Sequence, residues 1–151
     1  ISQFLREVPS YKAPFHPLAE YAKAFENSSY KVLKIVDAGS ESLVLELEDE
    51  RVIKISQGEI FTDERGRRKF DLPILDSGSF CIGGVDFSVD GYYIIQPKVY
   101  MNVSAEDTQE FVAMIKAAGY EDADIGYARQ KQLGYWKGAV YLVDYNSVRR
   151  K

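Results

Sequence analysis

The sequence contains few of the residues from which common metal and redox sites are built. It has one cysteine, Cys81, and one histidine, His16. A single cysteine excludes an internal disulfide and a multi-cysteine zinc site. A single histidine excludes a histidine-rich metal site and argues against a Ser-His-Asp triad. We therefore expect Cys81 to be a small buried side chain in a strand, and His16 to be a surface or capping residue.

Long apolar runs and an excess of positive charge are also missing. No apolar stretch is long enough to cross a bilayer and no signal peptide is visible, which argues against a membrane partner and favours a reducing, cytoplasmic setting. The formal net charge is −4, and this acidic balance argues against a general nucleic-acid binder, because neutralising phosphates requires a basic face. The hydrophobic share of 46% and the 11 tyrosines, which suit half-buried strand faces, are typical of a globular domain with its own core.

Hydrophobic periodicity predicts an α+β fold in a single compact domain, 1–151. Alternating residues and turn signals indicate an antiparallel five-stranded sheet within 30–100, preceded by an arm and a short helix within 1–29. A longer helix, an irregular loop and a C-terminal β-hairpin are expected within 101–151. The predicted elements are a loosely docked arm over 1–15, a helix over 17–25, strands over 30–35, 43–47, 51–56, 80–88 and 91–100, a helix over 104–118, and hairpin strands over 133–135 and 139–143.

Local signals fix the ends of several of these elements. Asp90-Gly91 and Lys137-Gly138 are turn signals for the last sheet hairpin and the C-terminal hairpin. Ser104 is an N-cap residue for the longer helix, with Asp107 three residues later. The apolar stripe expected on that helix consists of Phe111, Met114, Ile115 and Ala118.

Two charged residues occupy unusual places in the apolar pattern. Lys54 lies in the middle of the third strand, on the same face as Val52, and a lysine on a half-buried face needs a carboxylate or an anionic ligand. The alternative is an edge strand whose lysine faces water. Asp144 ends the apolar strand 139–143, where it can serve as a metal ligand or a base; the alternative is a buried strand that ends in a turn.

A basic cluster follows the third strand. Residues 58–70 are compatible with a short helix that carries Glu59 and Glu64 and then Arg65, Arg67, Arg68 and Lys69. The cluster could contact an anion, but we favour a solvated helix end, where cations complement the helix dipole.

This order of elements resembles the protein-kinase-like fold: a five-stranded antiparallel small lobe, a hinge and the start of a helical lobe. Arg51-Val52-Ile53-Lys54 resembles the Val-Ala-Ile-Lys of kinase strand three, and the resemblance implies that Lys54 pairs with the phosphates of ATP. It implies the same contact for the turn that holds Gly39, Ser40 and Ser42, in the place of the kinase glycine-rich loop. Glu64, or Glu59, would hold Lys54, and Asp144, in the place of the Asp-Phe-Gly aspartate, would hold Mg²⁺.

The sequence departs from the kinase pattern at the catalytic loop. Gln132 stands near the position of the metal-binding asparagine and Tyr127 near that of the catalytic aspartate. A glutamine oxygen can still coordinate a metal, whereas a tyrosine is no carboxylate base at neutral pH. Asp124 and Asp122 lie just upstream, and a shifted loop could bring one of them in as the base; Asp124 is the candidate that we name.

Three hypotheses follow. The first is a minimal pseudokinase, of the kind found in phages and mobile elements, that binds a protein partner, either with ATP and Mg²⁺ or with no cofactor, and does not transfer phosphate. The second is a small α+β interaction protein without kinase ancestry, such as an inhibitor of a host enzyme, which uses its tyrosines as interface anchors. The third is an active phosphotransferase with Asp124 as base and Asp144 as magnesium ligand.

Overall fold

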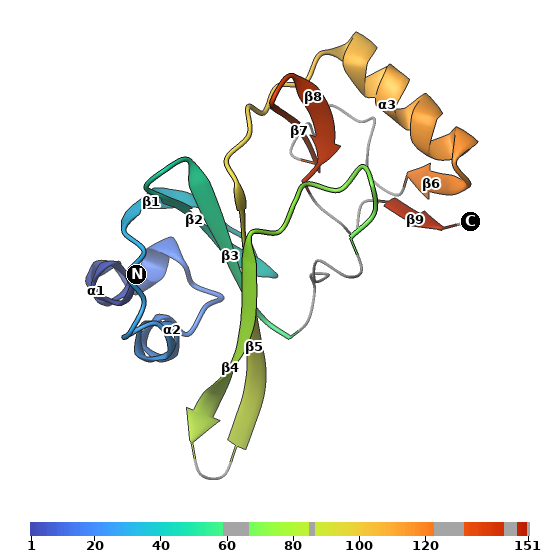
Figure 1. Cartoon of the computed structure of the whole chain (residues 1–151). Helices are drawn as coiled ribbons and strands as arrows, with labels where there is room; N and C mark the ends of the chain where they lie inside the picture. Colours follow the sequence, from blue (N-terminus) through green and yellow to red (C-terminus); the bar gives the residue numbers. More distant parts are fainter. Residues whose placement is uncertain (59–66, 85–86, 123–131, 144–147, 151) are drawn as a thin grey trace. The chain divides into compact units, whose positions relative to one another are not determined.

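The computed structural model describes residues 1–58, 67–84, 87–122, 132–143 and 148–150. Within these ranges the protein has an α+β fold, as the sequence predicts (Figure 1). Backbone contacts divide the chain into two compact units. The first comprises 1–63 and 74–96, and the second comprises 64–73 and 97–151. The grouping of both units into one domain stays a prediction.

The first unit is built on a five-stranded antiparallel sheet. Its strands are β1 (Val32–Ala38), β2 (Ser42–Leu47), β3 (Arg51–Gln57), β4 (Asp76–Gly84) and β5 (Phe87–Pro97). They are arranged in the order β1-β2-β3-β5-β4, so β3 is the central strand and β1 and β4 are the edges. The three predicted strands of the meander are confirmed, with ends that differ from the prediction by at most three residues.

Edge strand β1 has a burial period of three rather than two. Its pairing with β2 shifts register between Val32 and Lys34 and again between Ile35 and Asp37. At each shift β1 has one extra residue, Leu33 or Val36, that pairs with no residue of β2. Both of these side chains are about half exposed. The two bulges explain why a strand written VLKIVDA has apolar residues in water.

The β4–β5 hairpin corrects two predictions. Gly84 pairs with Phe87, so the strands are joined at 85–86, and the predicted turn at Asp90-Gly91 is wrong. Gly91 instead lies inside β5 opposite Phe80, whose ring atom Cε2 would lie 2.3 Å from a Cβ built on that glycine. The glycine is therefore required by ring packing across the strands and not by a turn. Cys81, predicted to be buried, is exposed because it points away from the core on this edge strand.

The N-terminal residues also differ from the prediction of a loosely docked arm. They form helix α1 (Ser2–Glu7) and the 3₁₀ turn η1 (Ser10–Lys12), followed by the predicted short helix, α2 (Leu18–Ala24). Leu5 of α1 and Tyr21 of α2 are almost fully buried. Both helices pack on one face of the sheet, against a core that includes Leu43, Leu45, Ile53, Ile55 and Ile95 (Figure 1).

The second unit contains α3 (Ala105–Ala117) and two small antiparallel ribbons. One ribbon pairs β6 (Tyr120–Asp122) with β9 (Val148–Arg150), and the other pairs β7 (Leu133–Trp136) with β8 (Ala139–Leu142). The predicted N-cap is confirmed, since Ser104 Oγ accepts a hydrogen bond of 3.1 Å from Asp107 N. The predicted β7–β8 hairpin is confirmed too, and Lys137 and Gly138 both have positive φ, as a tight hairpin turn requires.

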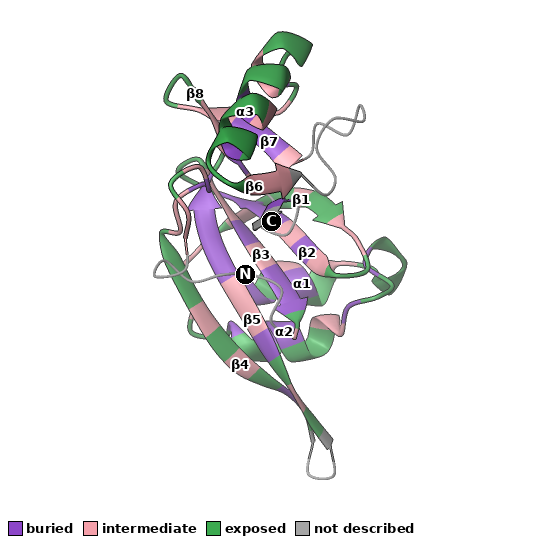
Figure 2. Cartoon of the chain, turned by 90° about the vertical axis from the view of Figure 1, so that its right-hand side faces the viewer, coloured by how far each residue is buried: buried purple, intermediate pink, exposed green. Residues whose placement is uncertain are grey.

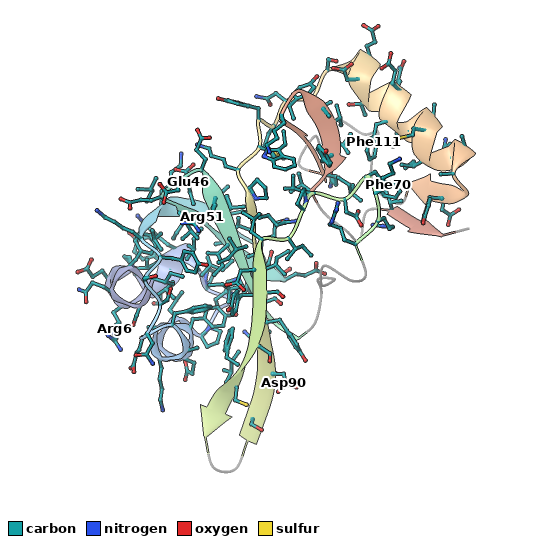
Figure 3. The ribbon with its side chains drawn as sticks, in the orientation of Figure 1. Arg6, Glu46, Arg51, Phe70, Asp90 and Phe111 are labelled. Atoms are coloured by element: carbon teal, nitrogen blue, oxygen red, sulfur yellow. The ribbon has the colours of Figure 1, made fainter. Side chains whose placement is uncertain are left out.

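The core of the second unit is formed by Phe111 and Ile115 of α3 together with buried residues of the ribbons. Phe70 packs edge-on against Phe111, with ring centroids 5.9 Å apart (Figure 3). Met114, predicted to lie on the apolar stripe, is 46% exposed. Among the helices of the described ranges, none is long and apolar enough to span a bilayer.

Candidate functional site

Lys54 lies on the central strand of the sheet. Because β3 has a neighbour on each side, the alternative that Lys54 blocks an edge strand is wrong. Its strand neighbours Ile53 and Ile55 are fully buried in the helical core, so Lys54 points to the opposite face of the sheet, where it is half-buried. Lys54 interacts there with at least one other group. This agrees with the expectation that a lysine in such a place needs a partner.

Apolar and acidic side chains surround Lys54 on this face. Val44 of β2 lies directly opposite Lys54, and Val52 precedes it by two residues on the same face. Glu46 pairs with Val52 and is therefore a diagonal neighbour of Lys54. Diagonal pairs lie about 7–8 Å apart, within reach of a lysine side chain. Glu46 is only 8% exposed and, like Lys54, interacts with other groups. In Figure 2, β2 and β3 are more buried than β4, which is mainly exposed or intermediate.

The predicted phosphate-contacting turn joins β1 to β2. It is closed by a hydrogen bond of 3.1 Å from Gly39 N to Ser42 O, and Ser40 is exposed at its tip. Gly39 has space for a side chain, since a Cβ built on it would lie 3.9 Å from its nearest neighbours, Asp37 Oδ2 and Ser42 O. The turn thus places the exposed residue Ser40 at the end of β1 and of β2, the strand that carries Val44.

His16 is buried and is not the surface residue expected from the sequence. Its ring nitrogen Nε2 lies 2.7 Å from Gly39 O, and Nδ1 lies 3.1 Å from the hydroxyl of Tyr21. Burial raises the pKa of Tyr21 to about 12, against a smaller lowering by a hydrogen bond from Gln57. Nothing in the sequence around a lone histidine before Pro17 indicates this contact with a turn more than twenty residues later.

Gln132, the predicted magnesium ligand, precedes β7. Its backbone oxygen accepts a hydrogen bond of 2.7 Å from Val143 N, which extends the β7–β8 pairing by one residue on each strand. The side-chain oxygen Oε1 is buried and has no hydrogen-bond partner among the described residues. A buried amide oxygen without a donor fits a role as a metal ligand, because a cation would satisfy it.

Several predicted site residues lie outside the described residues. These are the acids Glu59 and Glu64, the base Asp124, Tyr127 and the metal ligand Asp144. Within the described ranges, no group of three or more histidine, cysteine, aspartate or glutamate residues could hold a metal ion. Asp144 is the residue directly after Val143, whose amide is bonded to Gln132.

The basic cluster has a structural role that the sequence analysis missed. Arg68 and Asp71 form a buried ion pair, with Arg68 Nε 2.9 Å from Asp71 Oδ2 and Nη2 3.1 Å from Oδ1. Arg68 Nη1 also donates to Val148 O at 2.6 Å. Arg68 is therefore not a cation at a solvated helix end. The spacing of three residues between Arg68 and Asp71 is the feature of the sequence that could have indicated this ion pair.

The same short segment holds both flanks of residues 144–147. Leu142 N donates to Phe70 O at 2.8 Å, and Leu72 N donates to Leu142 O at 2.9 Å, so the segment pairs with β8. Arg68 bonds Val148, the first residue of β9. The chain on either side of the predicted metal ligand is thus fixed by one buried ion pair and its neighbours.

Comparison with known protein families finds no family model that matches the chain, and comparison with curated proteins finds no matching relative.

Proposed function

We propose that this chain is a kinase-like protein that binds ATP with Mg²⁺ and acts on a protein partner without transferring phosphate. Lys54 of the first unit would pair with the phosphates, and within the second unit Gln132 with Asp144 would hold a metal ion. Loss of transfer follows from the sequence, where Tyr127 and Gln132 replace the catalytic-loop aspartate and asparagine.

The observation that carries the proposal is the placement of Lys54. A lysine is rarely half-buried in the middle of a sheet unless a negative group compensates it. Here the lysine is on the central strand, between Val44 and Val52 and diagonal to Glu46. An apolar surface beside a cation suits a ligand that has a flat apolar base and an anionic tail, and a nucleotide has both.

The buried side-chain oxygen of Gln132, which has no hydrogen-bond partner in the described part of the chain, supports the metal part of the proposal. Two exposed aromatic residues support the partner part, since Tyr11 and Phe15 of the N-terminal region are 76% and 62% exposed. Aromatic residues of this kind are common anchors of protein interfaces.

The test is thermal unfolding of the full chain with and without ATP and Mg²⁺. At a ligand concentration of about 100 times Kd, binding stabilises the folded state by about 2.7 kcal/mol, which corresponds to about 5–10 °C in a protein of this size. We expect Lys54→Met to abolish the shift. Lys34→Met is the matched control, because Lys34 lies on the same face of the sheet, on edge strand β1 opposite Glu46.

The outcome separates the three hypotheses. A shift in the wild type without radiolabel transfer to the protein or to a general acceptor supports the proposal. Transfer that is lost in Asp144→Ala would replace it with an active phosphotransferase. No shift at millimolar ATP and Mg²⁺ would leave a small interaction protein without a nucleotide.

A further inference from the structure

One side chain of the N-terminal region reaches the β1–β2 turn. His16 lies just before α2, and its Nε2 is 2.7 Å from Gly39 O. A carbonyl oxygen can only accept, so Nε2 must carry the proton. In the neutral ring Nδ1 is then an acceptor, and it receives the hydroxyl hydrogen of Tyr21 at 3.1 Å. The two contacts therefore assign one tautomer and hold the ring from both sides.

The surroundings of His16 keep this ring in place. His16 is 9% exposed, and Tyr21 is completely buried beneath it. Gln57, which hydrogen-bonds Tyr21, also donates from Nε2 to Phe15 O at 3.2 Å. The residue before His16, the ring and α2 are thus linked in one network. A donor that is buried and held at both nitrogens is a rigid anchor for the carbonyl it contacts.

The anchored carbonyl determines where the next amide points. In a planar trans peptide the C=O of one residue and the N–H of the following residue point in opposite directions. Because Gly39 O is directed at His16, the N–H of Ser40 is directed away from His16. Rotation of this peptide plane is easy beside a glycine, which has few steric limits on its backbone dihedrals. The bond from His16 opposes that rotation.

We propose that His16 is a positioning residue, which fixes the Gly39–Ser40 peptide so that Ser40 N–H is presented to a phosphate oxygen of the bound ligand. Outward-pointing backbone N–H groups in tight turns are favourable contacts for phosphates. This inference rests on the proposed function, because that function supplies the phosphate. It adds a role for the N-terminal region, which would act on ligand binding through one hydrogen bond and no direct contact.

The test compares two substitutions of similar size. His16→Gln can place an amide nitrogen near the position of Nε2 and keeps the donor, whereas His16→Asn is too short to reach Gly39. In ligand-free protein, NMR should show a changed Gly39 carbonyl shift and a broadened Ser40 amide in His16→Asn, and near-normal signals in His16→Gln. Tyr21→Phe removes the other contact of the ring, keeps the Gly39 bond and serves as the stability control.

Titration of the same proteins with ATP and Mg²⁺ completes the test. We expect His16→Asn to bind about tenfold more weakly than the wild type, and His16→Gln to bind within about twofold. Unchanged Gly39 and Ser40 signals in His16→Asn would refute the anchor itself. Equal affinity of wild type and His16→Asn would refute the positioning role alone. Absence of binding by the wild type would instead overturn the proposed function and this inference with it.

Discussion

Removal of the Asp71 carboxylate should strongly destabilise the second unit. The side chains of Arg68 and Asp71 are 12% and 5% exposed. Asp71 accepts from Arg68 N at 2.8 Å, Nε at 2.9 Å and Nη2 at 3.1 Å. In Asp71→Ala all three donors lose their acceptor, and a guanidinium remains in a place that water hardly reaches.

The expected magnitude follows from this burial. Breaking a buried ion pair by removing one partner costs about 3–5 kcal/mol, mainly because the remaining charge is uncompensated. Arg68→Met removes the charge but keeps an apolar chain of similar length beside Phe70 and Tyr120, whose rings Arg68 covers at 4.9 and 5.7 Å. The double variant should therefore be more stable than the sum of the two single losses by at least about 1 kcal/mol.

The assay is urea unfolding followed by tryptophan fluorescence. Trp136 of β7 is the single tryptophan of the chain and lies in the second unit, so its signal reports the unit that contains the ion pair. A loss below about 1 kcal/mol in Asp71→Ala would contradict the reasoning, because that is the range of exposed ion pairs. The reasoning would also be contradicted if the loss of stability in the double variant equalled the sum of the losses in Asp71→Ala and Arg68→Met.

Three further predictions concern the first unit. The pKa of Tyr21 is raised from 10 to about 12, so the folded state favours the protonated phenol. The contribution of Tyr21 to stability should be complete below pH 10 and should fall by up to about 2–3 kcal/mol as the pH rises toward 12. In urea melts at several pH values, Tyr21→Phe should remove this pH dependence. Gly91→Ala forces the Phe80 ring to move and should destabilise the protein by about 1–3 kcal/mol, seen as a lower Tm. Gly58→Ala is the comparison, because no atom lies within 4 Å of the new Cβ and any loss of stability there comes from the positive φ of 82° alone. Glu50 has a φ of 55° in the β2–β3 turn, and Glu50→Gly should stabilise by about 1 kcal/mol in the same melts, a result that an unchanged or lower midpoint would contradict.

The sequence predicted those elements that are determined by neighbours close along the chain. The β2–β3 meander, the Ser104 N-cap and the β7–β8 hairpin follow from local alternation, capping and turn residues. The turn at Asp90-Gly91 was wrong because the same dipeptide is compatible with a strand when an aromatic ring lies across from the glycine. In that case tertiary packing outweighs the local turn propensity.

The same distinction between local and long-range interactions applies to the residues of the candidate site. Lys54 could be found because a charge interrupts an apolar strand, and strand period alone puts it opposite the core. The hydrogen bonds from His16 to Gly39 and from Arg68 to Val148 could not, since these partners are distant in sequence. Long-range hydrogen bonds leave no periodic trace, so a lone histidine or an arginine run has the same appearance whether it is solvated or buried.

The two edges of the five-stranded sheet have different capacities for growth. On β1 the extra residues Leu33 and Val36 interrupt the ladder twice, so a newly arriving strand cannot run beside it in step. The pairing of β4 with β5 is continuous from Asp76 to Gly84, and β4 has no bulge, proline or lysine. Among the described strands, the edge that favours the addition of a further strand is therefore β4, the strand that carries Cys81.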